Sequence, residues 1–64
     1  MSRLREMCEA IGILPQEEQD QIRRRIEAGE GWVGYAGERY IRVRGRVFAE
    51  KLVLLYLDQK GLVP

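Results

Sequence analysis

The spacing of hydrophobic residues changes twice along this chain of 64 residues. Up to residue 30 apolar residues recur at three- and four-residue intervals, and from residue 32 to residue 43 they alternate with polar residues. The helical interval returns from about Val47 to Lys60. Because these intervals are those of helices and strands, the sequence predicts a single α+β domain over residues 1–64. Its predicted order is α-α-β-β-α, with a two-stranded antiparallel hairpin packed on helices.

Glycine and proline residues separate two predicted helices in the first half of the chain. Gly12 ends the first helix, Pro15 suits the first turn of the second, and Gly29 ends the second. The predicted apolar face of the first helix consists of Leu4, Met7, Cys8 and Ile11. The second helix has only a narrow stripe of Ile22 and Ile26, so most of it is expected to face solvent.

The alternating segment predicts a hairpin with a two-residue turn at Ala36-Gly37. This turn would place Val33 opposite Tyr40 and Trp32 opposite Ile41. The face predicted to pack on the helices consists of Trp32, Ile41 and Val43. The outer face is predicted to consist of Val33, Tyr35, Tyr40, Arg42 and Arg44.

Basic residues are concentrated in and after this hairpin. Residues 1–30 contain five Arg and seven Asp or Glu, whereas residues 31–64 contain six Lys or Arg and three acidic residues. Guanidinium groups form forked contacts with phosphate, and tyrosine rings stack on unpaired bases. The predicted binding site for nucleic acid or an acidic protein partner consists of Tyr35, Arg39, Tyr40, Arg42, Arg44 and Arg46. The alternative is that these arginines only keep an exposed strand solvated.

The last predicted helix suggests a second kind of function. Leu52 to Leu57 is apolar on every side, which is more than a helix at the surface of a small domain needs. The predicted homo-oligomer or partner interface consists of Val53, Leu54, Tyr56 and Leu57. Such an interface would suit a dimer, an adaptor, an inhibitor or a regulatory subunit. Two alternatives remain: this is the central helix of the core, or Leu52 to Leu57 is a strand.

The composition argues against catalysis and against a cofactor. The chain has no histidine and one cysteine, Cys8, so it has no internal disulfide and no Cys/His zinc site. Gly29 to Gly34 matches G-x-G-x-x-G, but the predicted helix before it and strand after it are the reverse of a dinucleotide-binding unit. The second helix begins with acidic residues, which DNA phosphates would repel. We therefore expect a small non-catalytic binding module without cofactor or metal.

The longest apolar run, Leu52 to Leu57, is much shorter than a bilayer span. The sequence also shows no basic-then-apolar leader at its start. A soluble, cytoplasmic protein without membrane contact is therefore predicted.

Overall fold

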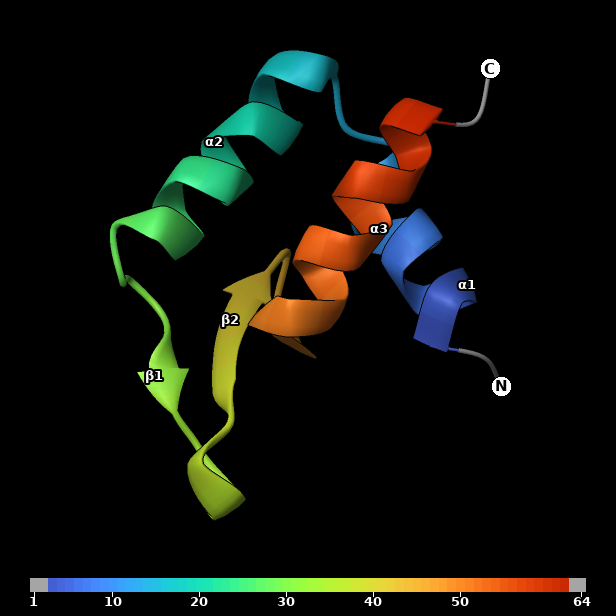
Figure 1. Cartoon of the computed structure of the whole chain (residues 1–64). Coiled ribbons are helices and arrows are strands. Elements are labelled where there is room, and N and C mark those ends of the chain that lie inside the picture. The colour runs from blue at the N-terminus through green and yellow to red at the C-terminus, as the bar shows by residue number, and fades with distance from the viewer. Residues whose placement is uncertain (1–2, 63–64) are drawn as a thin grey trace.

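The computed structural model describes the backbone of residues 3–62 and the side chains of residues 4–59 (Figure 1). This part of the chain forms three helices and a three-stranded antiparallel sheet, which confirms the predicted α+β class. None of these helices is long and apolar enough to cross a membrane. The elements are α1 (Arg3–Met7), η1 (Cys8–Gly12), α2 (Gln16–Glu27), β1 (Trp32–Val33), η2 (Tyr35–Gly37), β2 (Arg39–Val43), β3 (Arg46–Ala49) and α3 (Glu50–Leu62).

One face of the sheet packs against α3 and carries the core. The strand order is β1-β2-β3, and Ile41 of β2 pairs with Phe48 of β3 on this face. Both side chains are almost completely buried, as is Val53 of α3. Ile41 and Val43 therefore point inward, as predicted. The buried apolar residues are Met7, Ala10, Ile11, Ile22, Ile26, Ile41, Val43, Phe48, Val53 and Leu57.

The third strand was not predicted, because residues 47–49 were assigned to the last helix. The structure joins β2 to β3 through a two-residue turn at Arg44 and Gly45, with Val43 opposite Arg46. Both turn residues have positive φ, 52° at Arg44 and 80° at Gly45. This is the conformation of a type I′ turn, which matches the twist of antiparallel strands. The predicted start of the last helix at Val47 is therefore wrong, and α3 begins at Glu50.

The predicted register of β1 on β2 is wrong by one residue. Trp32 lies opposite Tyr40, and Val33 lies opposite Arg39. The connection is a three-residue loop, Tyr35–Gly37, because Ala36 takes a φ of 64° and the amide of Gly34 donates to the carbonyl of Glu38. A shift of one residue moves a side chain to the other face of a sheet. Trp32 is consequently on the outer face and 43% exposed, not in the core.

The predicted apolar face of the first helix is only partly correct. Met7 and Ile11 are buried, but Leu4 and Cys8 are exposed and Ala10 is buried in their place. The reason is the π-helical segment η1, which follows α1 directly. A π turn contains more residues than an α turn, so it rotates the following side chains relative to an α-helical spacing.

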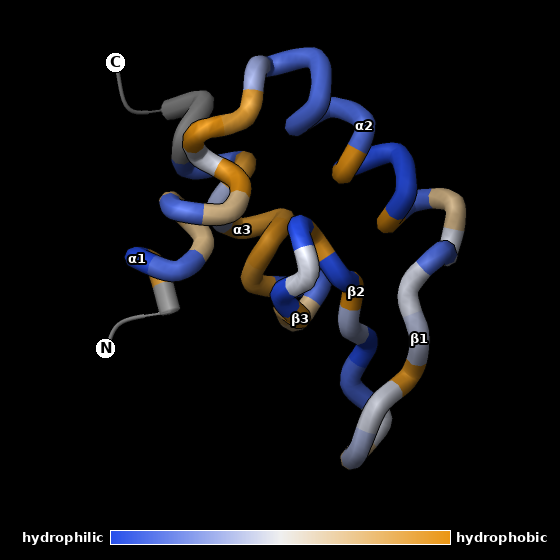
Figure 2. The backbone as a smooth tube through the Cα atoms, turned by 180° about the vertical axis from the view of Figure 1, so that it is seen from behind, coloured by the Kyte–Doolittle hydropathy of each residue, from blue (hydrophilic) through white to orange (hydrophobic). Residues whose placement is uncertain are grey.

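Helix α2 is mostly exposed, as predicted, and buries Ile22 and Ile26. Figure 2 shows it as a largely hydrophilic segment interrupted by short hydrophobic stretches. Polar contacts help to hold this helix in place. The buried amide of Gln19 donates to the carbonyl of Leu14 at 2.9 Å, and Arg23 pairs with Asp58 of α3 at 2.6 Å.

The turn at Arg44 and Gly45 gives a stability prediction. Gly45→Ala should lower the free energy of unfolding by about 1 kcal/mol, because a Cβ strains a residue at positive φ. Arg44→Asn should raise it by roughly 0.5 kcal/mol, because Asn tolerates positive φ better than Arg. Urea unfolding of the two variants measures both changes. Equal effects of the same sign would contradict a type I′ turn here.

Candidate functional site

The face of the sheet opposite α3 is open to solvent. Trp32, Tyr40 and Ala49 lie opposite one another in a row across the three strands, and Arg42 lies opposite Val47 in the next row. Residues paired across strands share a face. Arg42 is exposed, and Trp32 and Val47 are each more than two-fifths exposed. We call this surface, formed by Trp32, Tyr40, Arg42, Val47 and Ala49, the open face.

The ring of Tyr40 lies against the backbone of Gly34, directly after β1. A Cβ added at Gly34 would be 2.5 Å from Cε2 of Tyr40, so only glycine leaves room for the ring at this point. The ring is half-buried by this contact, while the directly opposite Trp32 remains exposed. The two aromatic side chains are therefore neighbours on the open face and differ in exposure.

Two predicted cations are available beside these rings. Arg42 lies on the open face and Arg44 lies in the turn that follows it, and both are exposed. Neither forms an ion pair with the side chains of residues 4–59. The carbonyl of Arg42 accepts a hydrogen bond from Arg25 at 3.2 Å, which ties this strand to α2. Glu38 lies beyond Tyr40 at the other end of the strand, so positive charge is concentrated at the Arg42 end.

Arg39 belongs to a different environment, because it lies on the helix side of the sheet. Its Nε donates to Oε1 of Glu50 at 3.2 Å, and its Nη2 donates to the carbonyl of Gly31 at 3.3 Å. The Glu50 side chain is only 9% exposed, and its Oε2 has no hydrogen-bond partner in the described part of the chain. Arg39 thus neutralises a buried carboxylate at the start of α3. Both residues also line a cleft of about 430 Å³.

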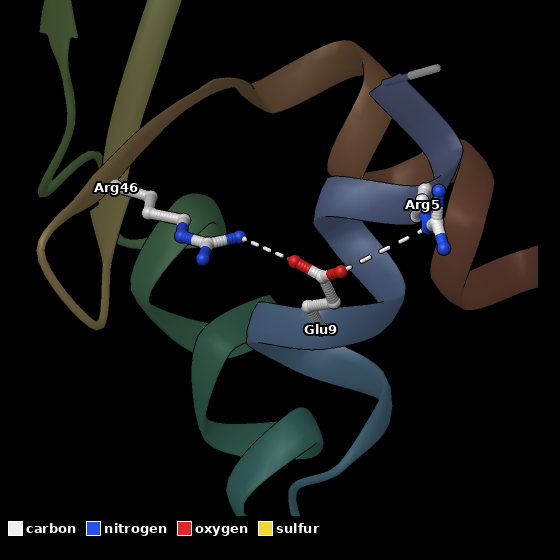
Figure 3. Close-up of polar contacts among 3 residues, drawn as sticks. All are labelled: Arg5, Glu9 and Arg46. Atoms are coloured by element: carbon white, nitrogen blue, oxygen red, sulfur yellow. Dashed lines mark hydrogen bonds and ion pairs between the residues drawn. The ribbon is translucent and has the colours of Figure 1, made fainter. Parts of the chain in front are cut away.

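Arg46 is likewise directed away from the open face. It shares the inner side of the sheet with its partner Val43, and its Nη1 contacts Oε2 of Glu9 at 3.2 Å. Figure 3 shows Glu9 between Arg46 and Arg5, whose Nε is 3.9 Å from the other carboxylate oxygen. This contact links β3 to η1.

The structure thus divides the predicted binding site into separate groups. Tyr40 and Arg42 share the open face with Trp32, which sequence reasoning had placed in the core. Arg44 lies next to this face, and Tyr35 is 95% exposed in the η2 loop. Arg39 and Arg46 are not part of this surface. The missing residue, Trp32, could have been found only by recognising the three-residue loop.

The predicted interface on the last helix is also distributed differently. Val53 and Leu57 are buried in the core, and Leu54 and Tyr56 pack against it. Among the described side chains of α3, which end at Gln59, the large apolar ones that are exposed are Leu52 and Leu55. Leu4 of α1 is exposed as well, and it lines a small surface hollow together with Leu52 and Leu55.

Cys8 is exposed, so its predicted place on the buried apolar face of the first helix is wrong. Its thiol and the Tyr56 hydroxyl lie together next to Gly12. Burial, and to a smaller extent the hydrogen bond and charge of Cys8, raise the pKa of Tyr56 above its ordinary value. Tyr56 therefore stays protonated at neutral pH. Among the described residues, no group of three or more His, Cys, Asp or Glu is placed to hold a metal ion.

Compared with protein-family models, with curated proteins and with solved structures, the chain gives no significant match.

The different environments of Arg39 and Arg42 give a second stability prediction. Arg39→Ala should lower the free energy of unfolding by about 1–3 kcal/mol, because Glu50 then remains buried without its partner. Arg42→Ala should change it by less than about 0.5 kcal/mol, because Arg42 is exposed and unpaired. Thermal and urea unfolding of both variants measure the difference. If Arg42→Ala is the more damaging change, the two side chains have been assigned to the wrong faces.

Proposed function

We propose that this chain is a small non-catalytic binding module that binds single-stranded nucleic acid on the open face. The observation that supports this proposal is the position of Trp32, Tyr40 and Arg42 on one uncovered side of the sheet. Unpaired bases stack on exposed aromatic rings, and guanidinium groups contact the phosphates between them. Arg44 extends the cationic end of this surface.

The arginines that lack an ion-pair partner support this role more directly than the total number of arginines does. Arg39 and Arg46 are occupied by Glu50 and Glu9. Arg42 and Arg44 have no such partner among the described side chains, so a phosphate can approach them without breaking an ion pair. Because only a few phosphates are contacted, binding should be weak, sensitive to salt and poorly selective for sequence.

The chain provides a direct optical test. Trp32 is its only tryptophan, so its fluorescence should be quenched when a short oligothymidylate stacks on the open face. Arg42→Glu should weaken binding about tenfold or more and should reduce the slope of log K against log salt by at least about 0.7. The matched control is Arg24→Glu, which makes the same charge change at an exposed arginine of α2 that forms no ion pair with the side chains of residues 4–59 and donates only to the carbonyl of Asp20.

Two results would contradict the proposal. One is the absence of binding to the oligonucleotide at low salt. The other is an equal effect of Arg42→Glu and Arg24→Glu, which would indicate attraction by net charge instead of a defined face.

Stacking can be tested separately from phosphate contact. Tyr40→Leu should weaken binding by about 1–3 kcal/mol, because a leucine keeps the apolar contact with Gly34 but offers no ring to a base. The salt slope should stay unchanged, because no charge is removed. Titrations at several salt concentrations measure both quantities. A changed slope with unchanged affinity would exclude stacking on Tyr40.

A second candidate function is supported by a different surface. Leu4, Leu52 and Leu55 are exposed next to one another where α1 meets α3. Adjacent exposed apolar side chains are typical of protein interfaces. In this alternative the chain is a protein-interaction module, and α3 docks through Leu52 and Leu55 instead of Val53 and Leu57. The partner is a protein or a second copy of the chain.

A further inference from the structure

Helix α3 carries a second apolar side that the fold leaves uncovered. Val53 and Leu57 face the core, whereas Leu52 and Leu55 lie at the surface, where Leu55 is 51% exposed. Gln59 continues the exposed side one turn further along. The spacing of these three residues is three and then four, which is the spacing of the contact seam in paired helices.

We call Leu52, Leu55 and Gln59 the seam of α3. Charged residues lie along one edge of this seam. Lys51 and Asp58 each precede a seam residue, and they are seven residues apart, so they lie on the same flank of α3. Lys51 is exposed and forms no ion pair with the side chains of residues 4–59. Asp58 contacts Arg23 through Oδ1 and is itself largely exposed, so it can accept a further donor.

We propose that this side of α3 binds α3 of a second copy of the chain in an antiparallel, two-fold symmetric pair. In antiparallel helix pairs, residues of the same flank meet across the interface. When Leu52 packs against Leu55 of the second copy, the heptad spacing places Lys51 opposite its Asp58. The symmetry repeats both contacts. In a parallel pair residues of opposite flanks meet instead, so Lys51 would face Tyr56 of the second copy and no Lys51–Asp58 contact would form.

The surface next to the seam is shaped for an incoming side chain. A hollow of about 100 Å³ is lined by Leu4, Met7, Leu52, Leu55, Tyr56 and Gln59. Its lining is almost entirely apolar, so a water molecule inside it finds few hydrogen-bond partners. An aliphatic side chain therefore fills it favourably. Leu4 thereby extends the contact area from α3 to α1.

The size of the seam determines how tightly two copies of the chain are expected to bind each other. Two leucines, Leu4 and one charged pair from each copy cover less area than a stable dimer normally buries. We therefore expect a reversible dimer with a dissociation constant on the order of 100 µM, not a permanent one. This inference identifies the partner of the second candidate interface as a second copy of the chain. It does not depend on nucleic-acid binding by the open face.

Sedimentation equilibrium of the full chain between about 10 µM and about 1 mM tests the proposal. The average mass should rise from 7.5 kDa toward twice that value. Leu55→Glu should raise the dissociation constant at least about 30-fold, because it places a carboxylate in the seam of both copies. Val47→Glu is the matched control, because it makes the same kind of change at an exposed residue of the open face and should leave the dimer intact.

Charge exchange tests the antiparallel arrangement itself. Lys51→Asp should weaken the dimer about tenfold, because two aspartates then face each other in both symmetric contacts. Adding Asp58→Lys to this variant together with Arg23→Glu, which keeps an ion pair between α2 and α3, should restore the dissociation constant to within about threefold of the original. Circular dichroism shows that each variant is folded. A monomer at every concentration, equal effects of Leu55→Glu and Val47→Glu, or no rescue by the added charge changes would each overturn the proposal.

Discussion

The pairing of β2 with β3 is the constraint on which the rest of this structure depends. The Arg44–Gly45 turn fixes Ile41 opposite Phe48, and this pair provides the surface on which Val53 of α3 packs. Since side chains alternate along a strand, burying Ile41 and Val43 forces Tyr40 and Arg42 to the other side. The core and the open face are thus two consequences of one register. A slip by one residue would exchange them.

The arginines of the hairpin show how one residue type is used in two ways. Arg39 and Arg46 lie on the helix side and connect the sheet to Glu50 and to Glu9. These contacts join strands to helices in a chain that has few buried residues to stabilise it. Arg42, on the outer side, is left with solvent. The side of the sheet on which an arginine lies therefore decides whether it has a structural role or is available to a partner.

Much of the fold could be predicted from the sequence, because its strongest signals are local. The spacing of Ile22 and Ile26 predicted the buried stripe of α2, and the alternation of Ile41 and Val43 predicted the inner face of β2. The errors in the strand register and in the buried face of the first helix arise at segments whose backbone departs from regular geometry. The π-helical segment moved Cys8 out of the core, and Ala36 at positive φ lengthened the loop before β2.

The candidate site was predicted less completely for the same reason. A longer loop changed the register of β1 and brought Trp32 next to Tyr40, which no spacing in the sequence indicates. The third strand depended on Arg44 at positive φ, a conformation that arginine rarely adopts. The partners of Arg39 and Arg46 are more than ten residues away in the sequence, so only the tertiary structure reveals them.

The most direct test of this account is the proton–proton contacts of the Trp32 ring, measured by NMR on the unbound chain. We expect nuclear Overhauser effects between the indole of Trp32 and the ring of Tyr40, its cross-strand neighbour. No such effects should connect the indole to the methyl groups of Ile41 or Val43. Contacts from the indole to those methyl groups would place Trp32 in the core and would contradict the open face.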